Sequence, residues 1–171
     1  MEYCQGIELL DFLNEADGIQ DESFVRYIFK EILKAIFSLH KAGMAHCDLK
    51  LENIMITKNF EIKLIDMGMI SSLTGESDTK FFTARRGTPS FMCPEMHGRR
   101  PYQGVDADIF ASFVILFSMR TLELPFDVAI STGLSSDKNY FYLQNGDTDK
   151  FWSKFVDKPS AEFKDLFEVM M

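Results

Sequence analysis

The sequence predicts a mainly helical α+β domain, in which a helical bundle surrounds a buried central helix and carries one small β-hairpin. Three observations lead to this prediction: an amphipathic helical pattern over residues 21–42, two short β-rich runs at 53–57 and 61–65, and a nearly continuous apolar stretch at 106–120. A chain of 171 residues can bury one substantial core but hardly two. Because no internal repeat or linker-like segment is visible, we expect residues 1–171 to form one unit.

The first predicted element is an amphipathic helix over residues 21–42. Asp21 and Ser23 offer side-chain oxygens for an N-terminal cap, and Gly43 supplies a stop. Between them, residues recur at intervals of three and four along one face of a helix. They are Val25, Ile28, Phe29, Ile32, Ile36, Leu39 and His40. The pattern therefore predicts a helix with one face packed against a core.

The second predicted element is a hairpin of two short strands. Residues 53–57 and 61–65 are rich in β-favouring side chains, and the turn-forming residues Lys58 and Asn59 separate them. Residues 66–100 then show no periodicity, and Ser, Thr, Gly and Pro are frequent there. A loop of that length inside a domain is usually either functional or disordered.

The third predicted element is a helix over residues 106–120. Its side chains are apolar on nearly every side, so we expect it to be packed all round, and the Leu-Pro-Phe run at 124–126 ends it. Residues 140–144 show a weak helical pattern. Pro159 and Ser160 begin a final amphipathic helix. Its apolar face consists of Phe163, Leu166, Phe167 and Met170.

Charge and cysteine content exclude several classes of partner. The formal net charge of −8 argues against nucleic acid or an anionic membrane, because a phosphate backbone requires clustered Lys and Arg. The three cysteines, Cys4, Cys47 and Cys93, are odd in number and widely spaced, which favours a reducing compartment. The most apolar run, 109–119, is too short to span a bilayer, and the chain shows no signal-peptide pattern. We therefore expect a soluble, cytoplasmic protein.

Two polar clusters carry groups suited to phosphoryl transfer. Residues 46–53 read His-Cys-Asp-Leu-Lys-Leu-Glu-Asn, and the Asp-Met-Gly run begins directly after the second predicted strand. Phosphoryl transfer requires a carboxylate near the attacking hydroxyl, a cation near the moving phosphate, and oxygen ligands for magnesium. Asp48, Lys50, Asn53 and Asp66 are groups of these kinds.

The order of the motifs resembles the signature set of eukaryotic-type serine/threonine protein kinases. The chain presents His-x-Asp-Leu-Lys-x-x-Asn at 46–53, the hairpin, Asp-x-Gly at 66–68, Gly-Thr-Pro at 87–89 and Cys-Pro-Glu at 93–95. Each motif alone is weak, but their order and spacing together are specific. The resemblance covers residues 1–171 and implies the C-terminal lobe of a kinase domain, with a likeness to calcium/calmodulin-regulated kinases. It implies ATP and magnesium as cofactors and a protein as substrate.

The resemblance assigns roles in the reaction to four residues. Asp48 would orient or accept the proton of the substrate hydroxyl, and Lys50 would neutralise the γ-phosphate. Asn53 and Asp66 would hold magnesium. Lys50 could also be an ordinary solvated lysine, but its register with Asp48 and Asn53 favours the functional interpretation.

For the nucleotide, the resemblance implies a hinge at the start of the chain. Met1, Glu2 and Cys4 would meet the adenine, Glu8 would contact the ribose, and Met55 would form the floor of the adenine pocket.

Six further residues receive substrate-binding or structural roles. Glu52 and Thr88 would contact the protein substrate, with Glu8 adding negative charge for a basic peptide. His46 and Met67 would belong to a packed column that aligns the two lobes. A buried aspartate is costly unless it is hydrogen-bonded, so Asp108 is expected to anchor the backbone of the 46–53 loop. Glu95, the glutamate of the Cys-Pro-Glu motif, is expected to have a structural role.

The sequence departs from the kinase pattern at the phosphate switch. Cys47 stands where an arginine usually precedes the catalytic aspartate, and Ala84 stands at the usual phosphorylated position. We therefore predict that the kinase does not need that phosphorylation. The remaining candidates for minor modification are Thr83, Thr79 and Ser77.

Arginine placement departs from the pattern as well. No arginine follows Arg120, although Glu95 in this family normally pairs with one beyond the last helix. Arg99 and Arg100 are expected to be solvated surface charge. The pair at 85–86 is expected to be solvated too, or alternatively to hold a phosphate.

No two of the ten glycines lie two residues apart, so the sequence holds no G-x-G-x-x-G loop, and the first lysine is Lys30, inside the predicted helix. We therefore expect the nucleotide-covering N-terminal lobe to belong to the parent chain and this chain alone not to turn over ATP. The alternative is a pseudokinase-like, non-catalytic docking lobe, although the retention of Asp48, Lys50, Asn53 and Asp66 disfavours it. An unrelated helical domain with chance motifs is a third interpretation.

Overall fold

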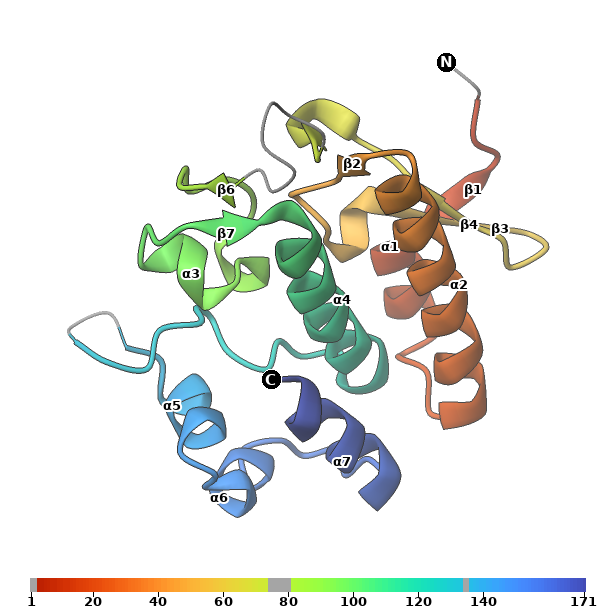
Figure 1. Ribbon diagram of the computed structural model, residues 1–171. Helices are drawn as coiled ribbons and strands as arrows, with labels where there is room; N and C mark the ends of the chain where they lie inside the picture. The colour runs from red at the N-terminus through yellow and green to blue at the C-terminus, as the bar shows by residue number, and fades with distance from the viewer. Residues whose placement is uncertain (1–2, 74–80, 134–135) are drawn as a thin grey trace.

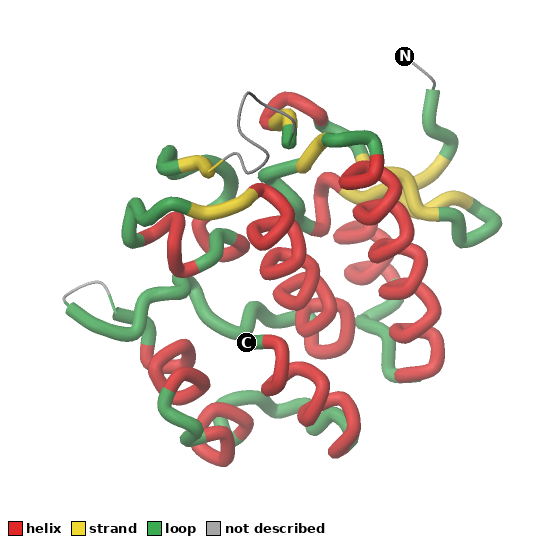
Figure 2. Tube along the Cα trace, viewed as in Figure 1, coloured by secondary structure: helices red, strands yellow, loops and turns green. Residues whose placement is uncertain are grey.

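A computed structural model describes residues 3–73, 81–133 and 136–171 and shows a mostly helical domain with small antiparallel sheets (Figure 1). The helices are α1 (Leu9–Glu15), α2 (Glu22–Lys41), α3 (Pro94–His97), α4 (Gly104–Thr121), α5 (Lys138–Gln144), α6 (Thr148–Trp152) and α7 (Ala161–Met170). The strands are β1 (Gly6–Glu8), β2 (Met44–Ala45), β3 (Ile54–Thr57), β4 (Ile62–Leu64), β5 (Ser71–Ser72), β6 (Phe81–Phe82) and β7 (Tyr102–Gln103). Figure 2 shows the strands gathered toward one end of the domain, with α5, α6 and α7 at the other.

Helix α4 lies in the middle of the domain, and α2 packs beside it (Figure 1). The α2 helix begins where Asp21 Oδ1 accepts a hydrogen bond from the backbone N–H of Ser23 at 2.9 Å, and it ends before Gly43, which has a φ of 74°. Ile28 and Ile32 on its inner face are fully buried. Both the extent and the buried face of the predicted helix are confirmed.

The α4 helix is the buried central element that its apolar sequence predicts. Every residue from Ala111 to Thr121 is buried, and the helix ends where Leu122 adopts a left-handed backbone conformation with a φ of 58°. Phe117 is fully buried and lies at the centre of an aromatic cluster. Its ring partners are Phe151, Trp152, Phe155 and Phe167. This cluster binds α6 and α7 to α4.

The predicted hairpin is present as strands β3 and β4. They pair antiparallel, with Ile54 opposite Leu64 and Ile56 opposite Ile62. Two adjoining elements had not been predicted: β1 extends the sheet to the order β1-β3-β4, and α1 follows it directly. The α6 helix had not been predicted either.

Two short strand pairs involve the interval at residues 66–100, in which the sequence shows no periodicity. Strand β5 pairs with β2, with Ser71 opposite Ala45, and β6 pairs with β7, with Phe82 opposite Tyr102. The start of α4 lies against β2 so closely that a Cβ at Gly104 would be 2.6 Å from the Cβ of Ala45. The described part of this interval also holds α3 and two 3-10 turns, Met67–Met69 and Pro89–Phe91. Another 3-10 turn, Leu51–Asn53, lies earlier in the chain, directly before β3.

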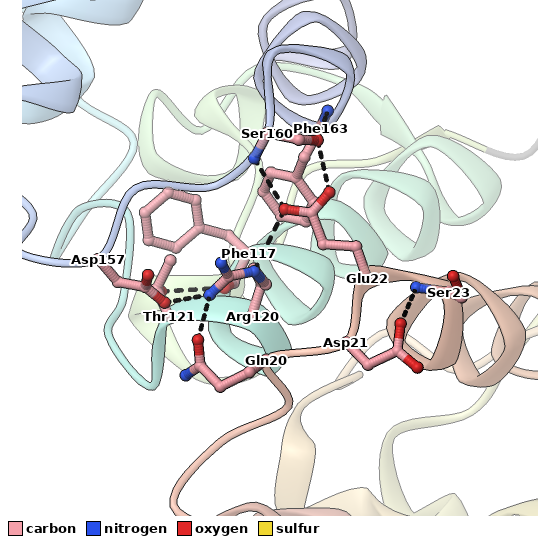
Figure 3. A network of polar contacts seen from close by, with 10 residues as sticks. All are labelled: Gln20, Asp21, Glu22, Ser23, Phe117, Arg120, Thr121, Asp157, Ser160 and Phe163. Atoms are coloured by element: carbon pink, nitrogen blue, oxygen red, sulfur yellow. Dashed lines mark hydrogen bonds and ion pairs between the residues drawn. The ribbon is translucent and has the colours of Figure 1, made fainter.

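A polar network joins the end of α4 to the start of α2 and to the segment before α7 (Figure 3). Arg120 Nε donates to Oε1 of Glu22 and Nη1 donates to Oε1 of Gln20, both at 3.3 Å, and Nη1 also contacts Asp157. Ser160 donates through its backbone N–H to Glu22 Oε1 at 2.8 Å and through Oγ to Oε2 at 2.5 Å. The network fixes the position of α7 relative to α2 and α4.

Ser160 also caps α7, because its Oγ accepts a hydrogen bond from the backbone N–H of Phe163 at 3.1 Å. The expected apolar face of α7 is only partly confirmed. Phe163 and Phe167 are buried, whereas Leu166 is 45% exposed and Met170 is 40% exposed. Among the described residues, no helix is both long and apolar enough to cross a membrane.

Candidate active site

The loop at residues 46–53 is anchored to the buried carboxylate of Asp108 in α4. Oδ2 of Asp108 accepts the backbone N–H of His46, and Oδ1 accepts that of Cys47, each at 2.8 Å. Nε2 of His40, from the last turn of α2, lies 2.8 Å from Oδ2. Asp108 is only 1% exposed, so these donors replace the water that the carboxylate loses on burial. The loop is thereby tied to both central helices.

Cys47 is the point at which this loop changes direction. Its backbone has a φ of 63°, a left-handed conformation that is unfavourable for residues other than glycine. The two hydrogen bonds that Asp108 accepts from His46 and Cys47 help hold this conformation in place. Burial raises the pKa of the Cys47 thiol to about 11, with a further contribution from the Asp108 carboxylate. The side chain at this position is therefore neutral.

Asp48, Asn53 and Thr88 form one hydrogen-bonded cluster. Oδ1 of Asp48 accepts the backbone N–H of Thr88 at 3.0 Å and its hydroxyl at 3.2 Å. Nδ2 of Asn53 donates to the Asp48 carbonyl at 2.8 Å and approaches its Oδ2 at 3.4 Å. These bonds fix the direction of the Asp48 carboxylate.

Gly87 allows the chain to approach Asp48 so closely. Its φ of 91° is unfavourable for other residues, and a Cβ there would lie 2.9 Å from the Cys47 carbonyl oxygen and 3.1 Å from Asp48 Oδ1. A side chain at this position would therefore push Thr88 away from the cluster.

The Asp66 turn lies beside the same loop. Nε2 of the fully buried His46 is 2.9 Å from the carbonyl oxygen of Ile65, and the Ile65 N–H donates to the carbonyl of Asn53 at 2.9 Å. Asp66 itself has a left-handed backbone, with φ 56° and ψ 69°, and its exposed carboxylate accepts the N–H of Gly68 at 3.3 Å. Met67, in the same turn, is 41% exposed.

The residues expected at the nucleotide lie along the three-stranded sheet. Glu8 in β1 is directly opposite Met55 in β3, and both side chains are partly buried. Cys4 is also partly buried and precedes β1. Met1 and Glu2 lie outside the described residues. The structure therefore brings Glu8 and Met55 together as neighbours.

The remaining predicted residues lie around the loop and α3. Lys50 and Glu52 are partly buried, Lys50 directly before and Glu52 within the 3-10 turn at 51–53. Glu95 has an arginine partner after all, since Nη2 of Arg100 lies 3.4 Å from its Oε1. Arg100 is exposed, as expected of solvated surface charge, and the turn after α3 also brings it to the partly exposed carboxylate of Glu95. Thr83 is exposed, and Ser77 and Thr79 lie outside the described residues.

Asn53 and Asp66 carry side-chain oxygens of the kind that could hold a magnesium ion. The Asn53 amide donates through Nδ2, which leaves its carbonyl oxygen as an acceptor, and the exposed Asp66 supplies a carboxylate. Within residues 3–73, 81–133 and 136–171, no three His, Cys, Asp or Glu side chains cluster closely enough to hold a metal. Carboxylate and amide oxygens are ligand types that magnesium accepts, together with waters and phosphate oxygens.

Sequence reasoning missed three contacts around this site. His40 had been included in the apolar stripe of α2, and its polar ring there was a signal of a buried partner, which is Asp108. Tyr102, whose hydroxyl donates to the Ala84 carbonyl at 2.9 Å, gave no sequence signal. Arg86 had been expected to be solvated or to hold a phosphate, and its bond to Ser71, in which Nη1 donates to Oγ at 3.3 Å, was not foreseen.

Comparison with known proteins identifies the family. Residues 1–171 match the protein kinase domain. The chain belongs to the protein kinase family. Among its relatives, this kinase domain is 35% identical over 127 residues to maternal embryonic leucine zipper kinase of Xenopus laevis and 36% identical over 127 residues to NUAK family SNF1-like kinase 1 of Mus musculus. It is also 35% identical over 129 residues to sperm motility kinase 2B of Mus musculus.

These alignments cover 74% to 75% of this chain but only 19% to 26% of the relatives. The chain therefore spans a small part of the length of the proteins that it matches. The match to this set confirms the resemblance to serine/threonine protein kinases and relates the chain to the group of kinases to which these relatives belong. It also implies that ATP is the nucleotide that such a domain uses.

Proposed function

We propose that this kinase domain forms the C-terminal lobe of a serine/threonine protein kinase that transfers the γ-phosphoryl group of ATP to a protein hydroxyl. One observation carries the proposal: Asp48 and Asn53 are hydrogen-bonded to each other on the loop that the buried Asp108 fixes to α4, and Thr88, from a segment 40 residues further along, donates to the Asp48 carboxylate. A carboxylate held this way is oriented before any substrate arrives, as catalysis by positioning requires.

In the proposed reaction, Asp48 receives the proton of the attacking serine or threonine hydroxyl. The two hydrogen bonds from Thr88 engage Oδ1 and hold the carboxylate in one orientation. Lys50, two residues further along the same loop, neutralises charge on the transferred phosphoryl group. Glu52 and Thr88 border the path of the peptide, where negative charge from Glu52 favours a basic substrate.

Asn53 and Asp66 are the residues proposed to hold magnesium. Magnesium, when bound, neutralises phosphate charge and holds the phosphoryl group in line with the hydroxyl. The backbone bond between Ile65 and Asn53 keeps the two proposed ligands in a fixed relation. The His46 ring bonds the Ile65 carbonyl and so also helps to hold the Asp66 turn in position next to the 46–53 loop.

The nucleotide is proposed to lie along β1 and β3. Met55 would support the adenine and Glu8 would contact the ribose, because the two are cross-strand neighbours. Cys4, with Met1 and Glu2 before it, would form the hinge. A second lobe of the parent chain would cover the phosphates, and we propose that the chain alone does not turn over ATP.

The experiment compares the 171-residue chain with a longer product of the same gene that extends upstream. Transfer of radiolabelled phosphate from magnesium-ATP to serine and threonine peptides is measured for both, and calorimetry measures nucleotide binding. We expect transfer only by the longer protein. Asp48→Asn in that protein should lower the rate by roughly 100- to 10,000-fold, since a carboxamide keeps the shape but is not a base.

Asp106→Asn is the matched control, because Asp106 is an exposed aspartate of α4 outside the cluster. Its rate should equal that of the unmodified protein. A residual rate of Asp48→Asn within a few-fold of the control would overturn the assignment of Asp48. Peptide binding without any transfer by the longer protein would instead favour a non-catalytic docking lobe. Micromolar ATP binding with phosphorylation by the short chain would defeat the proposed need for a second lobe.

A further inference from the structure

Residues 81–88, which precede and include Thr88, are held by a neutral hydrogen bond from Tyr102. The Tyr102 hydroxyl donates to the backbone carbonyl of Ala84 at 2.9 Å. Tyr102 is 3% exposed, so water does not compete effectively for this bond. Burial raises the pKa of Tyr102 to about 12, and the hydroxyl therefore remains a protonated donor at physiological pH.

The ring of Tyr102 is itself fixed by packing. Strand β6 pairs with β7 so that Phe82 lies opposite Tyr102, and the two ring centroids are 5.8 Å apart. Tyr102 belongs to a small buried cluster against which Phe82 packs. The other members of this cluster are Met92, Cys93, Met96 and Ala107. The hydroxyl is thus presented to Ala84 from a rigid base.

Two further contacts tie the same segment to the site. Nη1 of Arg86 donates to Ser71 Oγ at 3.3 Å, and Thr88 donates twice to Asp48. Ser71 lies on β5, which pairs with β2 immediately before the 46–53 loop. Ala84, Arg86 and Thr88 are therefore three successive attachment points, each two residues from the next.

Neither of the two positions that would form the usual phosphate clamp, 47 and 84, carries a charged side chain. The Cys47 side chain is a buried neutral thiol, and Ala84 carries no hydroxyl to phosphorylate. The segment nevertheless reaches Asp48, and the bond nearest to Ala84 is the one from Tyr102. Residues 81–88 are therefore held near Ala84 by a side chain, Tyr102, that bonds the backbone carbonyl of Ala84.

We propose that Tyr102 is a positioning residue, whose hydroxyl fixes the Ala84 backbone and so keeps Thr88 against Asp48 without a phosphate. Its importance for catalysis rests on the proposed function, but the attachment itself does not. Tyr102 acts through Ala84 and Thr88 and touches no reacting group.

The test removes the hydroxyl and keeps the ring, with Tyr102→Phe in the 171-residue chain. Residue-resolved hydrogen exchange is followed at Thr88, whose N–H donates to Asp48, and trypsin cleavage is followed at the exposed Arg85 and Arg86. We expect both rates to rise roughly 3- to 10-fold, the range expected for loss of one neutral hydrogen bond. Cleavage at Arg99, in the exposed turn after α3, should not change.

Tyr140→Phe is the matched control, because Tyr140 is also 3% exposed but lies on α5. It should leave exchange at Thr88 and cleavage after Arg85 unchanged. Rates for Tyr102→Phe within two-fold of this control would overturn the proposal. An equal rise at Arg99 would also overturn it, because that result indicates general loosening rather than loss of a local attachment.

Kinetic measurements on the longer protein distinguish a failure of this inference from a failure of the proposed function. In the longer protein, Tyr102→Phe should lower kcat and leave the KM for ATP unchanged. The residues proposed to contact the nucleotide, Glu8 and Met55, lie in the β1-β3-β4 sheet, whereas Tyr102 lies in the β6-β7 pair. A longer protein without phosphotransfer would remove the proposed function, yet the exchange and cleavage results would still decide the role of Tyr102. Normal kcat together with faster exchange would overturn its role in positioning.

Discussion

Nε of Arg120 lies 3.3 Å from Oε1 of Glu22, which joins the last turn of α4 to the first turn of α2 across 98 residues of sequence. The Arg120 side chain is only 8% exposed, and Asp157 provides it with a second carboxylate. A buried arginine of this kind loses its hydration on folding, so its partners are needed to compensate the charge.

Arg120→Ala should therefore destabilise the domain strongly. The substitution leaves Glu22 and Asp157 without their cation and opens space at the base of α4, so we expect a loss of about 3 kcal/mol in the free energy of unfolding. Urea unfolding measures this value. Arg26→Ala, at an exposed position of α2, is the control and should change stability by less than about 0.5 kcal/mol. Equal midpoints for the two variants would contradict the inferred role of the network.

Stability should fall in acid through Glu22. Partial burial alone would raise the pKa of this carboxyl, but the hydrogen bonds from Ser160 and the contacts with Arg120 outweigh burial and lower it below 4.5. A group whose pKa is depressed by folding stabilises the native state above its unfolded pKa, and this contribution is lost as the pH falls through the folded pKa.

The difference in unfolding free energy between the native chain and Glu22→Gln should therefore shrink as the pH falls from about 6 to about 3. Urea midpoints at several pH values measure it. Glu31→Gln, at a more exposed surface pair with Lys34, controls for the general effect of acid. A difference that stays constant over this range would show that Glu22 is not responsible.

The three cysteines should differ in reactivity toward iodoacetamide. Burial raises the pKa of both Cys47 and Cys93 to about 11, so little thiolate forms at neutral pH and access is blocked as well. Cys4 is only partly buried. Mass spectrometry of the native chain should show alkylation at Cys4 roughly 100-fold faster than at the other two. In urea all three should react alike, and rapid native alkylation of Cys47 would contradict its burial.

Dephosphorylation should leave the activity of the longer kinase nearly unchanged. Cys47 and Ala84 remove the usual arginine and phosphate together, and Tyr102 holds Ala84 instead. After phosphatase treatment, with phosphate release verified by mass spectrometry, we expect peptide phosphorylation rates within about two-fold of the untreated protein. A large loss would implicate Arg85 or Arg86 as the partner of a phosphate elsewhere in the segment.

The long elements were predictable because each is specified by local chemistry. The Asp21 cap and the stop at Gly43 fixed the limits of α2, and the apolar stripe between them fixed its buried face. The uniformly apolar α4 required burial on all sides. Helix α1 was missed although Leu9 and Leu13 are both fully buried and lie one turn apart, because seven residues give too short a pattern.

The site was predictable in its residue types but not in its contacts. Motif order brought Asp48 and Asn53 to notice, and both lie in one loop. The bond from Thr88 to Asp48 spans 40 residues, and that from Tyr102 to Ala84 spans 18 and depends on the pairing of β6 with β7. No local pattern encodes such a meeting. Arg120 was a missed signal, since a charged residue at the end of a buried helix indicates partners.

The absence of a side chain at Gly104 allows α4 to begin in close contact with β2. With a Cβ only 2.6 Å from that of Ala45, any other amino acid would separate the start of α4 from β2. Asp108 lies one helical turn further along α4, so the same shift would carry its carboxylate away from the amides of His46 and Cys47. A position without any functional group thereby helps to hold the amides of the 46–53 loop against Asp108, and a side chain introduced there would act on the candidate site from a distance.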